Sequence, residues 1–390
     1  MSVTSADELR AAIDGVLEAR RRVRARPVAM RARALATAAR RWQDDPLLHT
    51  ALPGSAGLSP AMVDAALPLV AGAFDVEAMT RLVHDEVGEP LPEAPPLVAH
   101  VLASNVPALA LPAIAHAVLL GSAVVVKSGR ADPLSAPAFV RALAEVDADL
   151  AATVFAADWP GGTRALDDVL LDAASVLVLT GADETVAALA PRATGRVLRH
   201  GTRFSVALAD DEADVHALAA DVVMYEQRGC LSPHAVWVRG DARRFAARLS
   251  DALAEAAGRL PPPPASPAER AAVRAFLDDA EWAGAEVRRG AWGAVVQRDL
   301  PHFIPTCGRR TIHVAPIAGG VLVDRLPAGT IECVGVAGEA PRGLEIAGVS
   351  RLCPLGRMQR PPLAWPRGGR PPLASLLGRS APGPVLQVET

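Results

Sequence analysis

The sequence predicts an α/β protein: a doubly wound parallel sheet followed by a second α/β domain. From residue 97 onward, apolar runs of strand length alternate with segments of helix length. This alternation is typical of parallel sheets that carry helices on both faces. A second series of such segments runs over 204–349. With 390 residues, of which 51% are hydrophobic, the chain is long enough for two cores.

The N-terminal region predicts helices. Residues 5–43 have a helical pattern with a break at Pro27, and a further helical segment spans 60–84. A proline-rich connection at 89–96 follows. We expect these helices to form a layer on the sheet, so that the first domain covers residues 1–203.

The predicted strands of the first sheet end in polar or glycine-containing loops. Ligands of such sheets bind beyond the carboxyl ends of the strands. No G-x-G-x-x-G is present, but the loops suit a dinucleotide. The residues that we predict to bind this cofactor are Ser104, Lys127, Arg130, Gly161, Gly162, Thr180 and Gly181.

Lys127 is the one lysine among 40 Lys and Arg residues. Because a compact ammonium group and a planar guanidinium are not interchangeable, the presence of a lysine in so arginine-rich a chain suggests that Lys127 binds a ligand. Its position at the end of a predicted strand favours the same interpretation.

Cys230 is the candidate nucleophile. The preceding helix is expected to end near Glu226, and an apolar strand begins at Ala235. Cys230 therefore lies on a loop between two anchored elements, where a scaffold can position a reactive thiol. Arg228 and His234 are close enough in sequence to favour the thiolate. The alternative is a buried packing cysteine.

Composition excludes several partners. A net charge of −3 leaves no broad basic surface for nucleic acid or an anionic membrane. Apolar runs such as 109–120 are too short to span a bilayer, and the N-terminus has no signal-peptide pattern. We therefore expect a cytoplasmic protein. The four cysteines lack the spacing of a metal site or disulfide framework: Cys230, Cys307, Cys333 and Cys353.

Four motifs in order resemble the aldehyde dehydrogenase superfamily, and within it the LuxC-type acyl-CoA reductases. They are Asn105-Val106-Pro107, the strand ending at Lys127, the loop Thr180-Gly181-Ala182-Asp183-Glu184, and Gln227-Arg228-Gly229-Cys230. The resemblance covers about 97–240 and returns near residue 348. It implies an aldehyde-dehydrogenase-like fold in which 350–390 return to the first domain and 204–349 form the catalytic domain.

The resemblance also implies roles. Cys230 would attack an acyl carbon, and Asn105 together with the Cys230 amide would bind the oxyanion. Lys127 would bind the adenosine ribose or a phosphate of the cofactor. For Asn105 the alternative is an Asx turn before Pro107.

Two departures from the superfamily indicate thioester reduction with NADPH. The stretch that matches the general-base glutamate motif, 198–203, holds no carboxylate, although His200 stays open as a base. Without a base for water, an acyl-cysteine persists until hydride arrives. Arg130, three residues after Lys127, suits the 2′-phosphate of NADPH; the alternative is a solvated surface arginine.

The predicted reaction is reduction of an acyl thioester, carried by CoA or a carrier protein, to an aldehyde. A long-chain fatty acyl group suits the aliphatic composition, and a homo-oligomer is possible. The alternatives are acyl-phosphate reduction, aldehyde oxidation, and a non-catalytic binding or assembly subunit. Cys307 and Cys353 are weaker candidates for the reactive thiol, because packing or loop roles suit them better.

Overall fold

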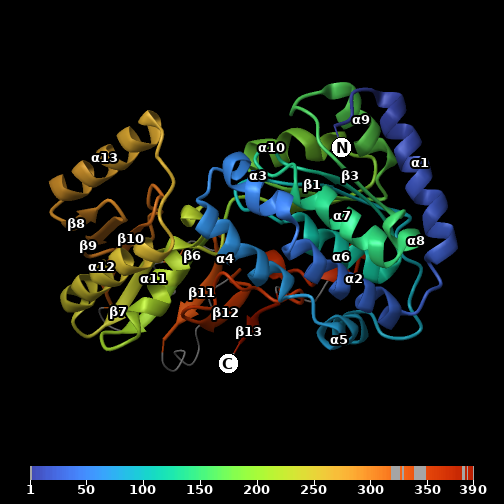
Figure 1. Cartoon of the computed structure of the whole chain (residues 1–390). Coiled ribbons are helices and arrows are strands. Elements are labelled where there is room, and N and C mark those ends of the chain that lie inside the picture. The colour runs from blue at the N-terminus through green and yellow to red at the C-terminus, as the bar shows by residue number, and fades with distance from the viewer. Residues whose placement is uncertain are drawn as a thin grey trace. The chain divides into compact units, whose positions relative to one another are not determined.

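The computed structural model describes residues 2–317, 326, 329–337, 348–379, 383 and 385–389. The chain divides into two compact units (Figure 1). The first comprises Met1–Thr202, Pro362–Trp365 and Arg370–Gly383, and the second comprises Arg203–Pro361, Pro366–Gly369 and Pro384–Thr390.

The first unit is built on a five-stranded sheet. Its strands are β1 (Leu97–Val101), β2 (Ala123–Lys127), β3 (Val154–Ala157), β4 (Val176–Thr180) and β5 (Arg196–His200). The strand order is β3-β2-β1-β4-β5, and all neighbours are parallel. Every residue of β1 and β4 is buried, which explains why these strands are continuous apolar runs rather than alternating ones.

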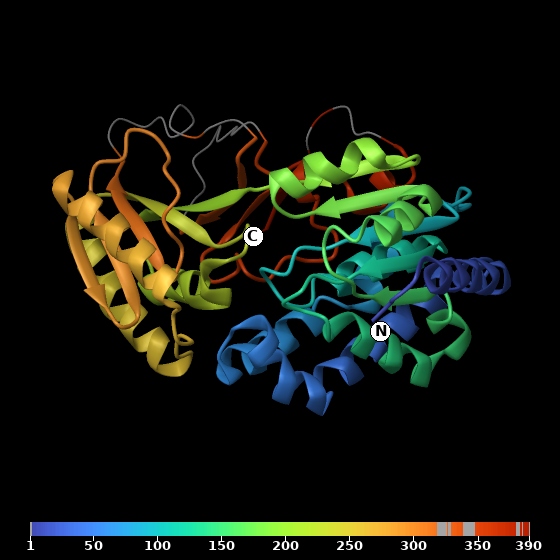
Figure 2. The ribbon, with the colours of Figure 1, turned by 90° about the horizontal axis from the view of Figure 1, so that it is seen from above.

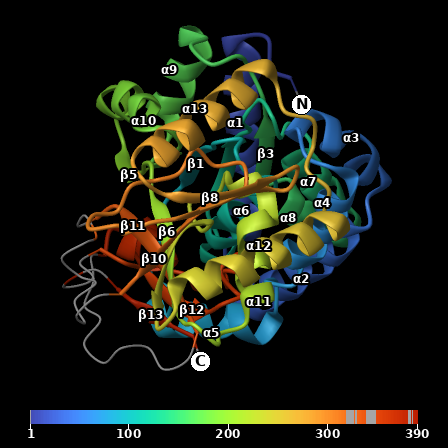
Figure 3. The ribbon, with the colours of Figure 1, turned by 90° about the vertical axis from the view of Figure 1, so that its left-hand side faces the viewer.

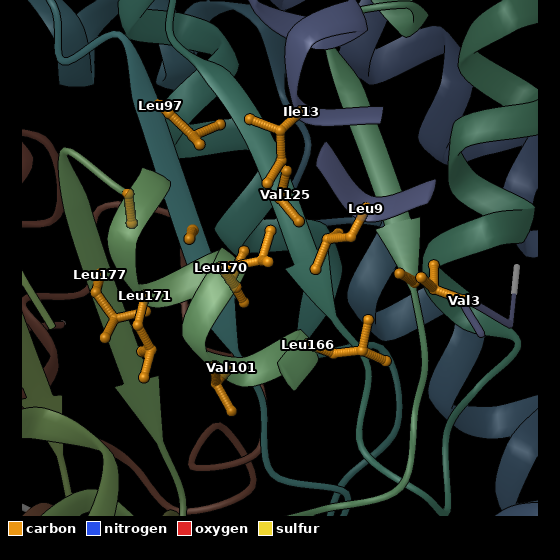
Figure 4. Packing of buried hydrophobic residues seen from close by; sticks show 14 of the residues in the cluster. Val3, Leu9, Ile13, Leu97, Val101, Val125, Leu166, Leu170, Leu171 and Leu177 are labelled. Atoms are coloured by element: carbon orange, nitrogen blue, oxygen red, sulfur yellow. The ribbon is translucent and has the colours of Figure 1, made fainter. Parts of the chain in front are cut away.

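Helices cover both faces of this sheet, as the doubly wound prediction requires. Odd-numbered strand residues such as Leu97 and Val125 form one core with α1 (Ala6–Val23) and α9 (Arg164–Ala173) (Figure 4). Helices α6 (Ala110–Leu120) and α7 (Ser135–Val146) contact β2 and β3. Two short helices complete the crossovers: α8 (Ala148–Ala151) and α10 (Asp183–Leu189).

The N-terminal helical layer is present. Helix α1 lies along the first unit (Figure 2) and is separated at Pro27 from α2 (Val28–Gln43), as expected; α2 packs on α6 and α7. The segment expected as one helix over 60–84 is two, α4 (Pro60–Ala71) and α5 (Val76–Glu86), because Asp75 caps a new helix by accepting the Ala78 N–H at 2.8 Å. Helix α3 (Pro46–Ala56) was not foreseen.

A C-terminal segment completes the first unit. Helix α14 (Pro372–Leu376) contacts α5 and α6. The Glu86 carboxylate accepts hydrogen bonds from the backbone N–H groups of Leu373 at 2.8 Å and Ala374 at 3.0 Å. A side chain at the end of α5 thus caps a helix that begins almost 290 residues later.

The second unit contains an eight-stranded sheet in the order β13-β12-β11-β6-β7-β10-β9-β8. The strands are β6 (Phe204–Asp210), β7 (Pro233–Arg239), β8 (Glu286–Gly290), β9 (Gly293–Gln297), β10 (Thr311–Pro316), β11 (Ile331–Val336), β12 (Arg351–Pro354) and β13 (Gln387–Val388). Only the β8–β9 pair is antiparallel.

Helices again lie on opposite faces of this sheet. Val295 of β9 packs with α11 (Val215–Val223) and α12 (Ala242–Arg259), whereas its neighbour Val296 packs with α13 (Pro267–Trp282). Figure 3 shows the strands running between α12 and α13. Successive strand residues therefore serve two cores, as the pleat requires.

The C-terminal region differs from the expected assignment. Of residues 350–390, all expected with the first domain, 350–361, 366–369 and 384–390 belong to the second unit, and Arg351–Pro354 form a strand. The reason is β12, which pairs in parallel with β11 over Cys333–Val336. In the described residues no single helix is long and apolar enough to cross a membrane, although α3 and α4, bent by 119°, meet the length and composition criteria as a pair.

Candidate active site

The predicted residues of the first unit all follow strands of one parallel sheet. The strands end at Val101, Lys127, Ala157 and Thr180. Because parallel strands present their carboxyl ends at the same edge, the structure places eight predicted residues at the strand ends or in the loops of that edge: Ser104, Asn105, Lys127, Arg130, Gly161, Gly162, Thr180 and Gly181.

The loop that carries Asn105 is fixed from the loop after β2. Asp132, a buried residue, accepts the Ala108 N–H at 2.7 Å and the Ser135 N–H at 3.0 Å. Gly129 lies so close that a Cβ on it would stand 2.6 Å from the Cβ of Ser104. Asn105 itself is exposed. The sequence did not reveal Asp132 because its two partners lie on different segments.

Lys127 lies over an aromatic ring. Its Nζ is 5.2 Å from the ring centroid of Trp159, whose Nε1 donates to Asp167 at 2.9 Å. Partial burial lowers the pKa of Lys127, and the carboxylates of Asp167 and Asp158 oppose that shift. The ammonium group is thus oriented and partly desolvated, whereas Arg130 is exposed.

Three glycines leave open space beside the backbone at this edge. A Cβ on Gly161, Gly162 or Gly181 would meet no atom within 4 Å. Gly162 has φ +82°, in the left-handed region that favours glycine. Helix α9 begins directly after it, at Arg164, and its N-cap residue makes no side-chain capping bond. A ligand can approach this backbone closely, and anions favour such a helix end.

In the second unit, the loop that carries Cys230 has a strained entry. Helix α11 ends at Val223, slightly earlier than expected, and a 3-10 turn spans Met224–Gln227. Three consecutive residues that are not glycine, Tyr225, Glu226 and Gln227, have φ of 54°, 56° and 61°. Backbone of this kind persists only where the surroundings over-determine it.

Buried polar contacts hold that strained turn. Glu226 pairs with Arg310, whose Nε donates at 3.0 Å, and each side chain is 1% exposed. The Gln227 amide nitrogen donates to the carbonyls of Pro233 and Thr311, each at 2.7 Å, while its oxygen accepts the Thr311 N–H at 2.9 Å. These bonds therefore fix the loop to two strands, β7 and β10.

Cys230 is half-buried, and burial raises the pKa of its thiol. The guanidinium groups of Arg367 and Arg203 and the thiol's hydrogen bond with its own backbone N–H oppose that rise, whereas the charge of Glu332 adds to it. The Cys230 carbonyl accepts the Ser205 hydroxyl at 2.6 Å. Two cations thus act on the thiol, and these are not the residues that the sequence suggested.

Sequence proximity suggested two residues, His234 and Arg228, that could favour the Cys230 thiolate. His234 is buried, accepts the Thr306 N–H on Nδ1 at 3.1 Å, and stacks edge-on against Phe204 with centroids 5.0 Å apart. Burial lowers the pKa of the half-buried Arg228, and the nearby guanidinium of Arg309 lowers it further. Sequence proximity misled for His234, because this side chain faces Thr306 and Phe204.

Glu332 is a buried carboxylate that sequence reasoning missed. Its Oε1 accepts the Gly368 N–H at 2.8 Å and the Ser350 hydroxyl, and its Oε2 lies 3.4 Å from Arg203 Nε. The residue is the extra one of a β-bulge, since Ile331 pairs with Phe204 and Cys333 with Ser205. A single acidic residue in the apolar strand IECVGV was the available signal.

The other three cysteines occupy different settings. Cys307 is half-buried and near the Thr311 hydroxyl at 3.7 Å, and burial raises its thiol pKa. Cys333 and Cys353 are fully buried, and their sulfur atoms lie 3.6 Å apart. Of the four, Cys230 is the one on a loop with two arginines acting on its thiol.

Solved structures of aldehyde dehydrogenases share this architecture. Lactaldehyde dehydrogenase from Escherichia coli matches with a TM-score of 0.69 and 18% identity over 90% of this chain and 83% of that one. The glyceraldehyde-3-phosphate dehydrogenase GapN from Methanocaldococcus jannaschii, complexed with NADP, matches with a TM-score of 0.70 and 13% identity over 91% and 87%. The chain therefore has the aldehyde dehydrogenase fold, as predicted.

Comparison of the sequence with known families identifies the family within the proteins of this fold. The family model described as acyl-CoA reductase (LuxC) matches residues 32–379, and the chain belongs to this family. The long-chain acyl-protein thioester reductase of Aliivibrio fischeri is 29% identical over 210 residues, which are 50% of this chain and 44% of that protein. The match thus spans less than half of that relative. The family predicted from four short motifs is confirmed.

Proposed function

We propose that this protein reduces an acyl thioester to an aldehyde through an acyl-cysteine on Cys230. The observation that carries the proposal is the loop of Cys230, which combines a strained, anchored backbone with two guanidinium groups that act on the thiol. Membership of the LuxC family supports the same reaction.

The chemistry begins at the sulfur of Cys230. Its thiolate attacks the acyl carbon, the carbon–sulfur bond to the leaving thiol breaks, and that thiol takes up a proton. Arg203 and Arg367 favour the thiolate against the cost of burial. We assign the oxyanion to the Asn105 side-chain amide and the Cys230 N–H, and losing one such donor typically costs about 3 kcal/mol in the transition state.

The acyl-enzyme is expected to persist. The segment 198–203 holds no carboxylate, so no side chain of that segment but His200 can activate water against the acyl-cysteine. His200 is the last residue of β5. Slow hydrolysis of the intermediate favours its reduction over release of a free acid.

The first sheet's loops fit a nicotinamide coenzyme, which supplies hydride to the acyl carbon when bound. Open space at Gly161, Gly162 and Gly181 admits phosphate groups close to the backbone. Lys127 is oriented by Trp159 to receive a ribose or a phosphate. We assign NADPH, because the exposed Arg130 follows the same strand and suits a 2′-phosphate.

The proposal also specifies the substrate, that is, the thiol carrier and the length of the acyl chain. The Aliivibrio fischeri relative is named for a long-chain acyl-protein thioester, and the family model is named for acyl-CoA. We propose a long-chain acyl thioester of either carrier as substrate. A cytoplasmic location and a homo-oligomer stay predictions from the sequence and its resemblance.

Intact-protein mass spectrometry tests this function. The full chain is incubated with acyl-CoA thioesters of several lengths, and separately with acyl carrier protein thioesters, without NADPH. We expect an acyl adduct in the wild type and none in Cys230→Ala, with Cys307→Ala as the matched control that keeps the adduct. An adduct that survives in Cys230→Ala, or none with any thioester, would refute the assignment.

A further inference from the structure

Ser205, the second residue of β6, lies where two neighbouring strands both carry an irregularity. On β11 the extra residue is Glu332, and on β7 it is His234, because Ser205 pairs with Pro233 and the next pair is Val206 with Ala235. Bulges cluster next to active sites, where they re-aim side chains and interrupt the ladder. Ser205 has a bulge on each of its two neighbouring strands, so the regular hydrogen-bond ladder is interrupted on both sides of this residue.

The Ser205 hydroxyl links the nucleophile to the neighbouring strand. It donates to the Cys230 carbonyl at 2.6 Å and accepts the Cys333 N–H at 3.2 Å. The side chain is fully buried, at 0% exposure. A hydroxyl is the one small side-chain group that can donate and accept at once, so no aliphatic residue of this size can make both bonds.

We infer that Ser205 is a positioning residue that fixes the peptide plane after Cys230 and thereby the direction of its thiol. This inference rests on the proposed function of Cys230. The loop before Cys230 is held in left-handed backbone by Glu226 and Gln227. On the other side, the Ser232 N–H closes a turn on the Gly229 carbonyl at 3.0 Å.

The bond from Ser205 ties Cys230 itself to the sheet. Anchors on both flanks fix the ends of the loop, but a peptide between fixed ends can still rotate. Holding the Cys230 carbonyl removes that rotation. Misplacing a reacting atom by about 1 Å costs about 100-fold in rate, so this one hydroxyl is expected to affect reactivity far more than its size suggests.

Alkylation of Cys230 by iodoacetamide, followed by peptide mass spectrometry across pH 6–10, tests the inference without substrate. We expect Ser205→Ala to slow Cys230 alkylation and acylation at least tenfold, with the dissociation constant for NADPH within twofold of wild type. Ser205→Thr keeps the hydroxyl and is expected to stay within threefold. Ser122→Ala is the matched control, since Ser122 is a buried serine of the first unit whose hydroxyl has no partner among the described residues.

The outcomes separate this inference from the proposed function. If wild type forms no acyl adduct while Ser205→Ala still slows alkylation, the function fails and the positioning role stands. Equal alkylation rates in Ser205→Ala and wild type overturn the positioning role, as does a Ser205→Thr variant that is as slow as Ser205→Ala. If Ser205→Ala does not fold, Ser205→Cys replaces it under the same tenfold criterion, because a thiol keeps the size but donates weakly.

Discussion

The loops that follow the strands differ between the two units in how far their side chains are buried and held by hydrogen bonds. At the strand ends of the first unit, several of the predicted ligand-binding residues are exposed or sit beside open space, as with Asn105, Arg130 and Gly161, whereas Thr180 is buried. The Cys230 loop of the second unit is bound by buried side chains at Glu226 and Gln227. These differences fit the proposed roles, in which the first unit's loops bind a coenzyme and the Cys230 loop holds the sulfur in a fixed position.

This difference follows from what each group must do. A loop that binds a ligand gains its order from the ligand, so its polar groups stay open to it. A nucleophile is best held in its reactive geometry before the substrate binds, because the reaction then does not have to include the entropic cost of positioning it. We therefore expect substitutions at the Cys230 loop to affect folding and reactivity, and substitutions at the predicted coenzyme-binding residues of the first unit to affect coenzyme binding.

The largest expected effect comes from the ion pair beneath the Cys230 loop. Glu226→Gln leaves the Arg310 guanidinium, which is 1% exposed, without its carboxylate. Removing one partner of a buried pair costs about 3–5 kcal/mol. Urea unfolding should show this loss in the free energy of unfolding, together with slower alkylation of Cys230.

Glu77→Gln provides the contrasting control in the first unit. Glu77 pairs with Arg81 across one helical turn, with the side chains 82% and 63% exposed. Exposed pairs contribute about 0–1 kcal/mol. A Glu226→Gln variant no less stable than Glu77→Gln would show that the Cys230 loop does not depend on its buried ion pair.

Acid should weaken the first unit more than the second. Burial lowers the pKa of His100 to about 3 and of His116, His234 and His313 to about 4. Below the unfolded value of about 6.5 the unfolded chain binds more protons, so stability falls as the pH drops from 6.5 toward 4, by about 1–2 kcal/mol per histidine at pH 5. Each unit holds two of them.

In each unit a partly or fully buried carboxyl group acts in the opposite direction, and the shift in pKa is large for the one in the second unit. In the first unit burial raises the pKa of Glu86, and the N–H groups of Ala374 and Leu373 oppose that rise. Burial raises the pKa of Asp221 in the second unit to about 7, so its folded form binds a proton first and stability rises as the pH falls below 7. Hydrogen exchange at pH 5 and pH 7.5 should show a greater loss of protection in β1–β4 than in β6, β7 and β10. Asp221→Asn should remove the difference, and equal losses in the wild type would contradict it.

The smallest expected effect is at Arg130. Because it is exposed, Arg130→Ala should leave folding unchanged and raise the dissociation constant for NADPH about tenfold through loss of a charge-assisted bond. Binding of NADH should change less than twofold. Fluorescence titration measures both, with the exposed Arg33→Ala as control; an equal loss for the two coenzymes would end the 2′-phosphate assignment.

Much of the fold could be predicted because it is local in sequence. Strand and helix segments of the first unit were readable from apolar periodicity, and the loop residues followed from the rule for parallel sheets. The division of residues 60–84 into α4 and α5 was not predicted, because the helix cap at Asp75 is a single side chain in an apolar stretch. The strand β12 was not predicted because its four residues lie in a segment rich in Pro and Gly, and it is its pairing with β11 and β13 that makes it a strand.

The environment of Cys230 could not be predicted for the same reason. Cys230 lies within a few residues of Gln227, which the motif included, but Ser205, Glu332 and Arg367 come from distant segments of the chain. No periodicity joins such positions. His234, which proximity in sequence favoured, accepts the Thr306 N–H instead.

The cap that Glu86 provides for α14 has a consequence for biosynthesis. A ribosome releases Leu373 and Ala374 only after nearly all of the second unit has emerged, yet both complete the first. Domains usually fold in the order of their synthesis. Here the earlier domain is completed only when residues 372–376 have been synthesised, so the surfaces of α5 and α6 that receive α14 stay uncovered until then, and a nascent chain stalled before residue 372 would present them to chaperones.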